Sequence, residues 1–178
     1  MIIDQLKIVF SQFNDTAEIV SYEELASGHI NDTYLVTTSN NESFVVQRIN
    51  QGVFKDVSGL INNKVAISKH IQRKLSDLSK SESARKVLTF VSTKDGKPFY
   101  YGKDGGYWNI MVYIADSVTH ETVKSKEIAF EGGKLIGDFL NLTSDFDANL
   151  LIEVIPKFHD MSFRFSQFED ALKVASKE

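Results

Sequence analysis

The sequence predicts an α+β fold, in which one long helix is inserted into an antiparallel sheet and further helices follow. Short β-rich segments divided by turn residues occupy residues 33–49 and 86–114. Between them, apolar residues recur at helical spacing over residues 56–78, and the same period returns over residues 126–143. The chain has 178 residues, of which 42% are hydrophobic, and this is enough apolar material for a core of that kind.

The first part of the chain predicts one helix and a set of strands. Residues 4–13 place apolar side chains at helical spacing, and residues 18–25 allow a short strand. A polar turn over residues 26–32 then leads into a β-rich segment at residues 33–38. Residues 43–49 return antiparallel to it, so the two segments form a hairpin.

The long helix is expected over residues 56–78, with Asp56 as its cap. Its buried stripe is predicted to contain the apolar residues at three- and four-residue steps, namely Leu60, Ile67, Ile71, Leu75 and Leu78. Its polar residues are expected elsewhere around the helix, namely Lys64, Lys69, Gln72 and Arg73. Residues 80–85 are rich in polar side chains and are expected to be a connector.

Three further strands are expected over residues 86–93, 98–101 and 107–114, divided by the turn sequences Asp95-Gly96 and Asp104-Gly105-Gly106. After a connector, helices are expected over residues 126–143 and 163–175. The buried side of the first of these helices is predicted to be Ile128, Leu135, Ile136, Phe139 and Leu142.

This order of elements is the layout of a protein-kinase-like N-terminal lobe: a five-stranded antiparallel sheet with an inserted long helix. Residues 1–115 are expected to form that lobe and to bind a nucleotide. Residues 116–178 are expected to form the hinge and the incomplete start of a helical C-terminal lobe.

Composition excludes several classes of function. The net charge is −4 with no basic block, so no nucleic-acid partner is expected. Cysteine is absent, which excludes disulfides, cysteine-ligated metals and thiol nucleophiles. Asp4 and Lys7 interrupt the apolar N-terminal segment, which therefore reads as neither a signal peptide nor a membrane span. A cytoplasmic protein with no membrane partner is expected.

Two segments could hold a phosphate group. The turn Ser27–Asp32 contains Gly28, and a glycine lets backbone N–H groups approach phosphate oxygens closely; an ordinary hairpin turn is the alternative. Arg48 supplies one cation in an apolar strand, with an edge-strand arginine reaching solvent as the alternative. Asn62 and Asn63 stand where a carboxylate partner on the long helix would be expected.

No catalytic residue and no metal site is predicted in this chain. The four histidines share no metal-ligand spacing. A kinase catalytic loop needs His-x-Asp followed by Asn after a four-residue gap. Asp104 and Asn109 have the Asp-to-Asn spacing, but they straddle a hairpin turn with Gly102 in the histidine position, and the match is rejected.

The motif Gly28-His29-Ile30-Asn31-Asp32-Thr33-Tyr34, followed by the run from Val45 to Phe54, resembles the aminoglycoside phosphotransferase and choline kinase superfamily. Within it, the sequence is most similar to the N-acetylhexosamine 1-kinase branch. Further similar segments follow in the order typical of that branch, namely residues 95–108, 113–123, the helix ending at Leu142, and residues 151–160. The resemblance covers nearly the whole chain, up to the point where the catalytic loop would be expected.

The resemblance implies a bilobal kinase-like fold that transfers the γ-phosphate of ATP, with Mg²⁺, to a sugar hydroxyl. Residues Gly28, His29, Asn31, Asp32 and Thr33 would cover the nucleotide phosphates, with His29 or Asn31 reaching the sugar. Arg48 or Gln47, next to Val46, would occupy the position of the phosphate-binding lysine. The hinge that holds adenine would be residues 113–116, with Tyr113, Ile114 and Asp116 as binding residues.

The function expected from this resemblance is the nucleotide-binding part of an ATP-dependent small-molecule kinase, with an N-acetylhexosamine as substrate. The catalytic loop and the Mg²⁺ ligands would belong to the missing C-terminal lobe, so this chain alone is expected to be inactive. The alternative is a non-catalytic binding or regulatory module that keeps the lobe. Self-association through the exposed lobe interface is also expected.

Overall fold

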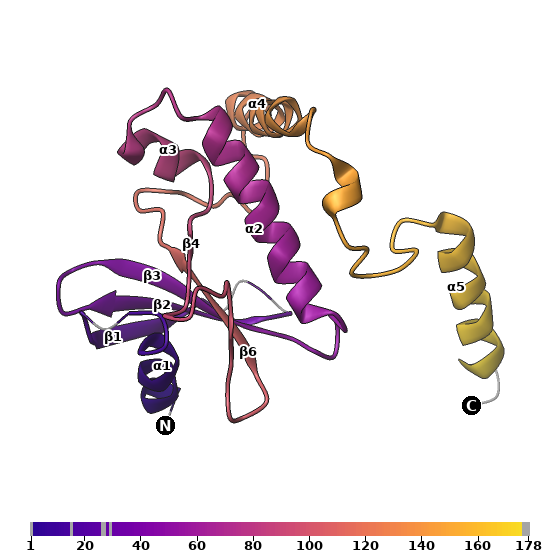
Figure 1. Ribbon diagram of the computed structural model, residues 1–178. Coiled ribbons are helices and arrows are strands. Elements are labelled where there is room, and N and C mark those ends of the chain that lie inside the picture. The colour runs from indigo at the N-terminus through magenta and orange to yellow at the C-terminus, as the bar shows by residue number, and fades with distance from the viewer. Residues whose placement is uncertain (1, 15, 26–27, 29, 176–178) are drawn as a thin grey trace.

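The computed structural model describes residues 2–14, 16–25, 28 and 30–175. It contains an antiparallel sheet with helices on both of its faces (Figure 1). The elements are, in chain order, α1 (Ile2–Phe10), β1 (Ile19–Glu24), β2 (Asp32–Thr38), β3 (Ser43–Ile49), α2 (Val57–Lys74), α3 (Lys80–Lys86), β4 (Phe90–Val91), β5 (Tyr100–Tyr101), β6 (Tyr107–Val112), α4 (Lys126–Thr143), the 3₁₀ helix η1 (Ala148–Leu150) and α5 (Met161–Ala175).

The sheet has six strands, one more than the sequence predicts. Its order is β1-β2-β3-β6-β4, and β5 also pairs with β6. The extra strand is β1, in the segment for which the sequence only allowed a strand. All pairings are antiparallel, and β3 lies in the middle, with β2 on one side and β6 on the other. Residues on β3 are therefore placed between neighbours on both sides.

Helix α1 covers one face of the sheet and forms the larger core. Leu6, Val9 and Phe10 of α1 are buried against side chains from the central strands, because the helix presents these residues on one side at steps of three or four. The strand residues in this cluster are Ile19, Tyr34, Val36, Phe44, Val46, Trp108 and Ile110. The alternation of these residues along β2 and β3 fixes which side chains point to the opposite face.

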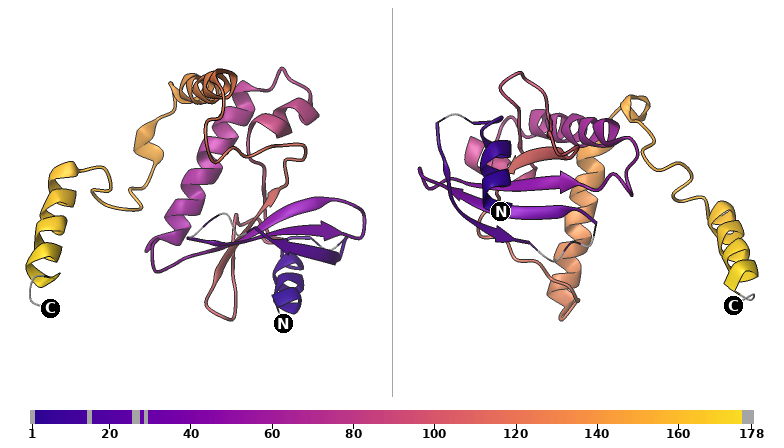
Figure 2. Two further views of the ribbon diagram at one scale, coloured as in Figure 1. Left: turned by 180° about the vertical axis from the view of Figure 1, so that it is seen from behind. Right: turned by 90° about the horizontal axis from the view of Figure 1, so that it is seen from below.

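Helix α2 crosses the other face of the sheet (Figure 2). It begins as predicted, because the Asp56 side chain accepts a hydrogen bond from the Gly59 backbone N–H at 2.8 Å. It ends at Lys74, so Leu75 and Leu78 lie beyond it. The buried side chains of α2 are Val57, Ile61, Ser68 and Ile71. Lys64 falls within this row rather than elsewhere around the helix.

The segment after α2 differs from the prediction. The expected connector at residues 80–85 is helix α3, which begins with a reciprocal capping box between Ser79 and Glu82. The following strands are shorter than predicted, since β4 and β5 have two residues each. Gly96 and Gly105 adopt positive φ angles of 81° and 74° in the two predicted turns, which confirms the turn chemistry there.

The chain after residue 115 packs little against the rest. Helix α4 lies beside the C-terminal half of α2, whereas α5 stands apart at the end of an extended segment (Figures 1 and 2). Both helices are where the sequence predicts them. Neither contains a buried residue, so the predicted buried side of α4 is wrong in this structure: Leu135, Ile136 and Phe139 are exposed.

Candidate functional site

The predicted phosphate-binding turn joins β1 to β2. Glu24 pairs with Tyr34, and the Leu25 backbone N–H donates to the Thr33 carbonyl oxygen at 2.8 Å, so the segment is the turn of an antiparallel hairpin. His29, predicted to contact phosphate or sugar, lies outside the described residues. Gly28 is exposed, and no atom of the other described residues lies within 4 Å of the position that a Cβ would take. The turn is therefore open on the side of Gly28.

The end of this turn is fastened to the end of β3. The Asn50 backbone N–H donates to Asn31 Oδ1 at 2.9 Å, which holds Asn31 beside the last residues of β3. A hollow of about 260 Å³ lies here. Its lining residues are Ile30, Asp32, Arg48, Ile49, Asn50 and Gln51. Three of the predicted site residues, Asn31, Asp32 and Arg48, are thus brought together at the end of the hairpin.

Arg48 and Gln47 point to opposite faces of the sheet. Arg48 shares the face of Val46, which is fully buried in the core beneath α1. Its guanidinium lies 3.3 Å from Asp104 Oδ2 and 3.7 Å from Asp32 Oδ2, and 5.8 Å from the Trp108 ring centroid. The carboxyl groups of these two aspartates offset the positive charge of Arg48.

Gln47 faces α2 and forms part of a polar row. Its Nε2 donates to Thr33 Oγ1 at 3.2 Å, and its Oε1 accepts a hydrogen bond from Lys64 Nζ at 3.2 Å. Lys64 therefore stands opposite β3, where the sequence analysis considered Asn62 and Asn63. Gln47 is thus the β3 residue that contacts α2. This contact places two predicted site residues, Thr33 and Gln47, next to Lys64, which the sequence analysis did not assign to the site.

Lys64 is the functional candidate that sequence reasoning missed. The side chain is half-buried, and loss of contact with water lowers the pKa of its ammonium group from its ordinary value. A signal was present in the sequence, because position 64 lies three residues after Ile61 and four before Ser68, in register with the buried row. The apolar stripe predicted from the sequence contained Leu60 and Ile67, which are next to Ile61 and Ser68 of the buried row in the chain, and only Ile71 belongs to both.

The predicted adenine-binding segment, residues 113–116, follows β6. The Tyr113 backbone N–H donates to the Ser43 carbonyl oxygen at 3.1 Å, so the segment begins beside the start of β3. Arg85 of α3 donates to the carbonyl oxygens of Ala115 and Asp116 at 3.0 and 3.4 Å. Asp116 has a φ of 53°, in the left-handed region, where the chain leaves the sheet. Ile114 is half-buried between these anchors.

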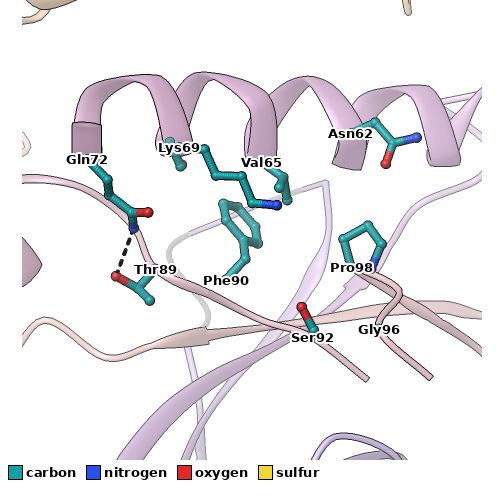
Figure 3. Close-up of a pocket in the computed structure, with 10 residues that line it drawn as sticks. Asn62, Val65, Lys69, Gln72, Thr89, Phe90, Ser92, Gly96 and Pro98 are labelled. Carbon is teal, nitrogen blue, oxygen red and sulfur yellow. Dashed lines mark hydrogen bonds between the residues drawn. The ribbon is translucent and has the colours of Figure 1, made fainter. Parts of the chain in front are cut away.

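A groove of about 230 Å³ lies between α2 and the β4–β5 segment (Figure 3). Gln72 reaches across it from α2 and donates to Thr89 Oγ1 at 3.3 Å, and Phe90 and Pro98 face the helix from the other side. The groove contains none of the predicted nucleotide-binding residues. Phe90, which lines the groove, has its ring centroid 5.4 Å from Lys64 Nζ, so the groove borders this lysine.

The helix α2 also holds the segment that follows α4. Asn63 Nδ2 donates to the Ile152 carbonyl oxygen at 2.7 Å, and the Ile152 backbone N–H donates to Asn63 Oδ1 at 3.0 Å. Asp145 forms an ion pair with Lys74 and lies 3.1 Å from His70 Nε2. Asn63 and His70 thus have structural partners.

Within residues 2–14, 16–25, 28 and 30–175, no group of three or more histidine, cysteine or acidic side chains is arranged to hold a metal ion. In the same part of the chain, no helix combines the length and the apolar character needed to cross a bilayer.

No protein-family model matches the sequence. The structure is similar to the crystal structure of an aminoglycoside phosphotransferase from Alicyclobacillus acidocaldarius, with a TM-score of 0.60 and 15% sequence identity. The similarity covers 96% of this chain and 44% of that protein, so this chain spans less than half of the neighbour's length. The chain therefore has the fold of the matching part of an aminoglycoside phosphotransferase.

Proposed function

We propose that this chain is the nucleotide-binding part of an ATP-dependent phosphotransferase. The observation that carries the proposal is the fold shared with part of an aminoglycoside phosphotransferase, in which the β1–β2 turn and the segment after β6 lie here beside opposite ends of β3. Phosphoryl transfer depends mainly on positioning and on charge stabilisation, so a lobe that orients the nucleotide is one half of the machinery.

The spacing of the two predicted binding segments supports this proposal. Residue Tyr113 is anchored at Ser43, the start of β3, whereas Asp32 pairs with Arg48 near its end. At about 3.3 Å a residue, the five steps between Ser43 and Arg48 span about 17 Å. That is the order of length of an extended nucleoside triphosphate. Adenine would lie against residues 113–116, and the phosphates would lie beneath the turn that contains Gly28.

The substrate that we propose is the hydroxyl group of an N-acetylhexosamine. The support is the resemblance of the segment from Gly28 to Tyr34 to the N-acetylhexosamine 1-kinase branch. Asn31, whose side chain accepts a hydrogen bond from the Asn50 backbone N–H beside the hollow, or His29 would reach the sugar. Mg²⁺ would neutralise the phosphate charge in such an enzyme. We propose that its ligands belong to a second lobe.

Calorimetric titration of the chain with MgATP tests this proposal, with a Gly28→Val variant beside the wild type. A Cβ at position 28 meets no atom of the described residues within 4 Å, so we attribute a loss of affinity to contact with the ligand rather than to a change in packing. Gly137→Val on α4 is the matched control, because Gly137 also has open space around it. We expect binding by the wild type and the control, and at least about a tenfold weaker binding by Gly28→Val.

A specific observation favours a second candidate, a non-catalytic module that keeps the fold. The strand side chain facing α2 is the neutral Gln47, where protein kinases place a lysine. This alternative predicts no heat of binding for MgATP with any variant. An unchanged affinity of Gly28→Val would place the ligand elsewhere on the chain and contradict the proposed position of the phosphates.

A further inference from the structure

Lys64 occupies a position that the packing of α2 otherwise gives to small or apolar side chains. The row that faces the sheet contains Val57, Ile61, Ser68 and Ile71, all of them buried. Lys64 lies in the middle of this row, at the spacing that keeps a helical residue on the same face. A charge withdrawn from water in such a place destabilises the fold unless it has a partner.

The partner that Lys64 has is neutral. Its Nζ donates to Gln47 Oε1 at 3.2 Å and lies 5.4 Å from the centroid of the Phe90 ring. Throughout the described part of the chain, no carboxylate lies within ion-pair distance of this ammonium group. Desolvation is the cause of its lowered pKa, with no opposing contribution from a nearby acid. The charge therefore remains available to an anion.

Arg48 differs from Lys64 in this respect. Its guanidinium is placed between Asp32 and Asp104 on the other face of the sheet. An anion that approached Arg48 would compete with two carboxylates, whereas one that approached Lys64 would compete with an amide. The balance of charge favours Lys64 as the site of an incoming phosphate.

The arrangement also reverses the one known from protein kinases. There, a lysine of the central strand contacts the nucleotide phosphates and pairs with a glutamate of the long helix. Here, the strand side chain that faces the helix is Gln47, and the helix supplies the cation. Lys64 Nζ and Gln47 Oε1 lie at hydrogen-bond distance. The ammonium group therefore lies beside the central strand, although its side chain belongs to the long helix.

We propose that Lys64, positioned by Gln47, is the cation of this lobe that binds the phosphates of a nucleoside triphosphate. The inference rests on the proposed nucleotide-binding function and adds which residue supplies the charge. Gln47 acts as a positioning residue: it orients the ammonium group through Oε1 and is itself held by Thr33 through Nε2.

Calorimetry of the 178-residue chain with MgATP and, separately, with adenosine tests this assignment. Lys64→Met keeps the length of the side chain and removes its charge. We expect it to weaken MgATP binding by at least about tenfold, since a charge-assisted hydrogen bond is lost, and to change adenosine binding by less than about twofold. Lys69→Met, at an exposed lysine of the same helix that lines the groove beside Phe90, is the matched control and should bind both ligands as the wild type does.

A charge exchange gives a second test. Lys64→Glu alone should abolish MgATP binding, because it puts a carboxylate where the phosphates would lie. Adding Gln47→Lys to that variant restores a strand lysine paired with a helix glutamate, and we expect affinity to return to within about fivefold of the wild type. Failure of the double variant to recover, while its thermal unfolding matches that of the wild type, would contradict the assignment.

Protection of the lysine from acylation measures the same contact without relying on a variant. MgATP should slow the modification of Lys64 by an acetylating reagent, as followed by mass spectrometry, and adenosine should not. Lys69 should react equally with and without either ligand.

The outcomes separate this inference from the function on which it rests. If the wild type binds neither MgATP nor adenosine, both proposals fail. If it binds MgATP and Lys64→Met binds it equally well, the lobe binds nucleotide but Lys64 is not the cation. An equal loss of MgATP and adenosine binding in Lys64→Met would also overturn the inference, because it would indicate a change in the fold rather than a lost phosphate contact.

Discussion

Asn109 is a buried amide on the central strand β6, next to Gln47 in the sheet. Neither its Oδ1 nor its Nδ2 has a hydrogen-bond partner among the described residues. An amide withdrawn from water without partners costs free energy of folding, and leucine has the same branching without that cost. We expect Asn109→Leu to raise the free energy of unfolding by about 1–3 kcal/mol, as measured by urea unfolding.

Thr93→Val is the comparison for that experiment. Thr93 is also buried, but its Oγ1 accepts from the Lys97 backbone N–H at 2.9 Å and donates to Asp95 Oδ1 at 2.5 Å. Its replacement removes satisfied hydrogen bonds and should lower the free energy of unfolding by about 1 kcal/mol. A destabilised Asn109→Leu would mean that the amide has a role in the native state that the static contacts do not show.

At the scale of single residues, the sequence predicted part of the candidate site. Alternation along a strand is enough to state that Gln47 and Arg48 point to opposite faces. Which of the two faces lies under the long helix depends on the position of that helix above the sheet, and no local pattern encodes it. For the same reason Lys64 was placed outside the buried stripe: the phase of the stripe is set by the sheet beneath it.

Helix α2 connects the sheet to the segment after α4, and one of its contacts depends on pH. The hydrogen bond from Lys74 is the main reason that the pKa of Asp145 is lowered, and the bond from His70 contributes further. A carboxyl group whose pKa falls on folding stabilises the native state above its unfolded pKa, about 3.9, and this contribution is lost as the pH falls through the folded value.

We therefore expect Asp145→Asn to unfold at a lower temperature than the wild type at pH 6, with the difference shrinking as the pH falls below about 3.9. Thermal unfolding followed by circular dichroism across that range measures it. Glu121→Gln, an exposed carboxylate between β6 and α4, should behave as the wild type at every pH. A difference for Asp145→Asn that persists at low pH would contradict the role of the charge.

Among the elements, the long periodic ones were predicted and the short ones were not. Helices α2 and α4 have about five turns each, so the helical period of their apolar residues repeats often enough to be recognised in the sequence. Strands β4 and β5 have two residues each, and their lengths are set by pairing with β6. Helix α3 has no apolar stripe, but the Ser79-x-x-Glu82 capping box was its sequence signal.

For the whole molecule, the sheet with α1 and α2 forms a packed body, while α4 and α5 are left without a cover (Figure 1). Hydropathy alone predicts that the apolar side of such helices is buried, which is why the sequence analysis assigned α4 a buried side. The sequence pattern does not show which surface would cover the apolar sides of α4 and α5. In α5, Phe165, Phe168 and Leu172 lie on one side at steps of three and four, and all are exposed.

An exposed apolar row of this kind favours association with another surface, and in a solution of this chain alone that surface is a second copy. We expect the sedimentation coefficient to rise with concentration, and the mass to exceed the 20.1 kDa of one chain. The double variant Phe165→Glu and Phe168→Glu should remain at the mass of one chain. Ser166→Glu with Gln167→Glu adds the same charge outside the row and should still associate. If the wild type instead sediments as a single chain at all concentrations, exposure of these helices does not lead to self-association. The apolar row of α5 would then be covered by other residues of the same chain in solution.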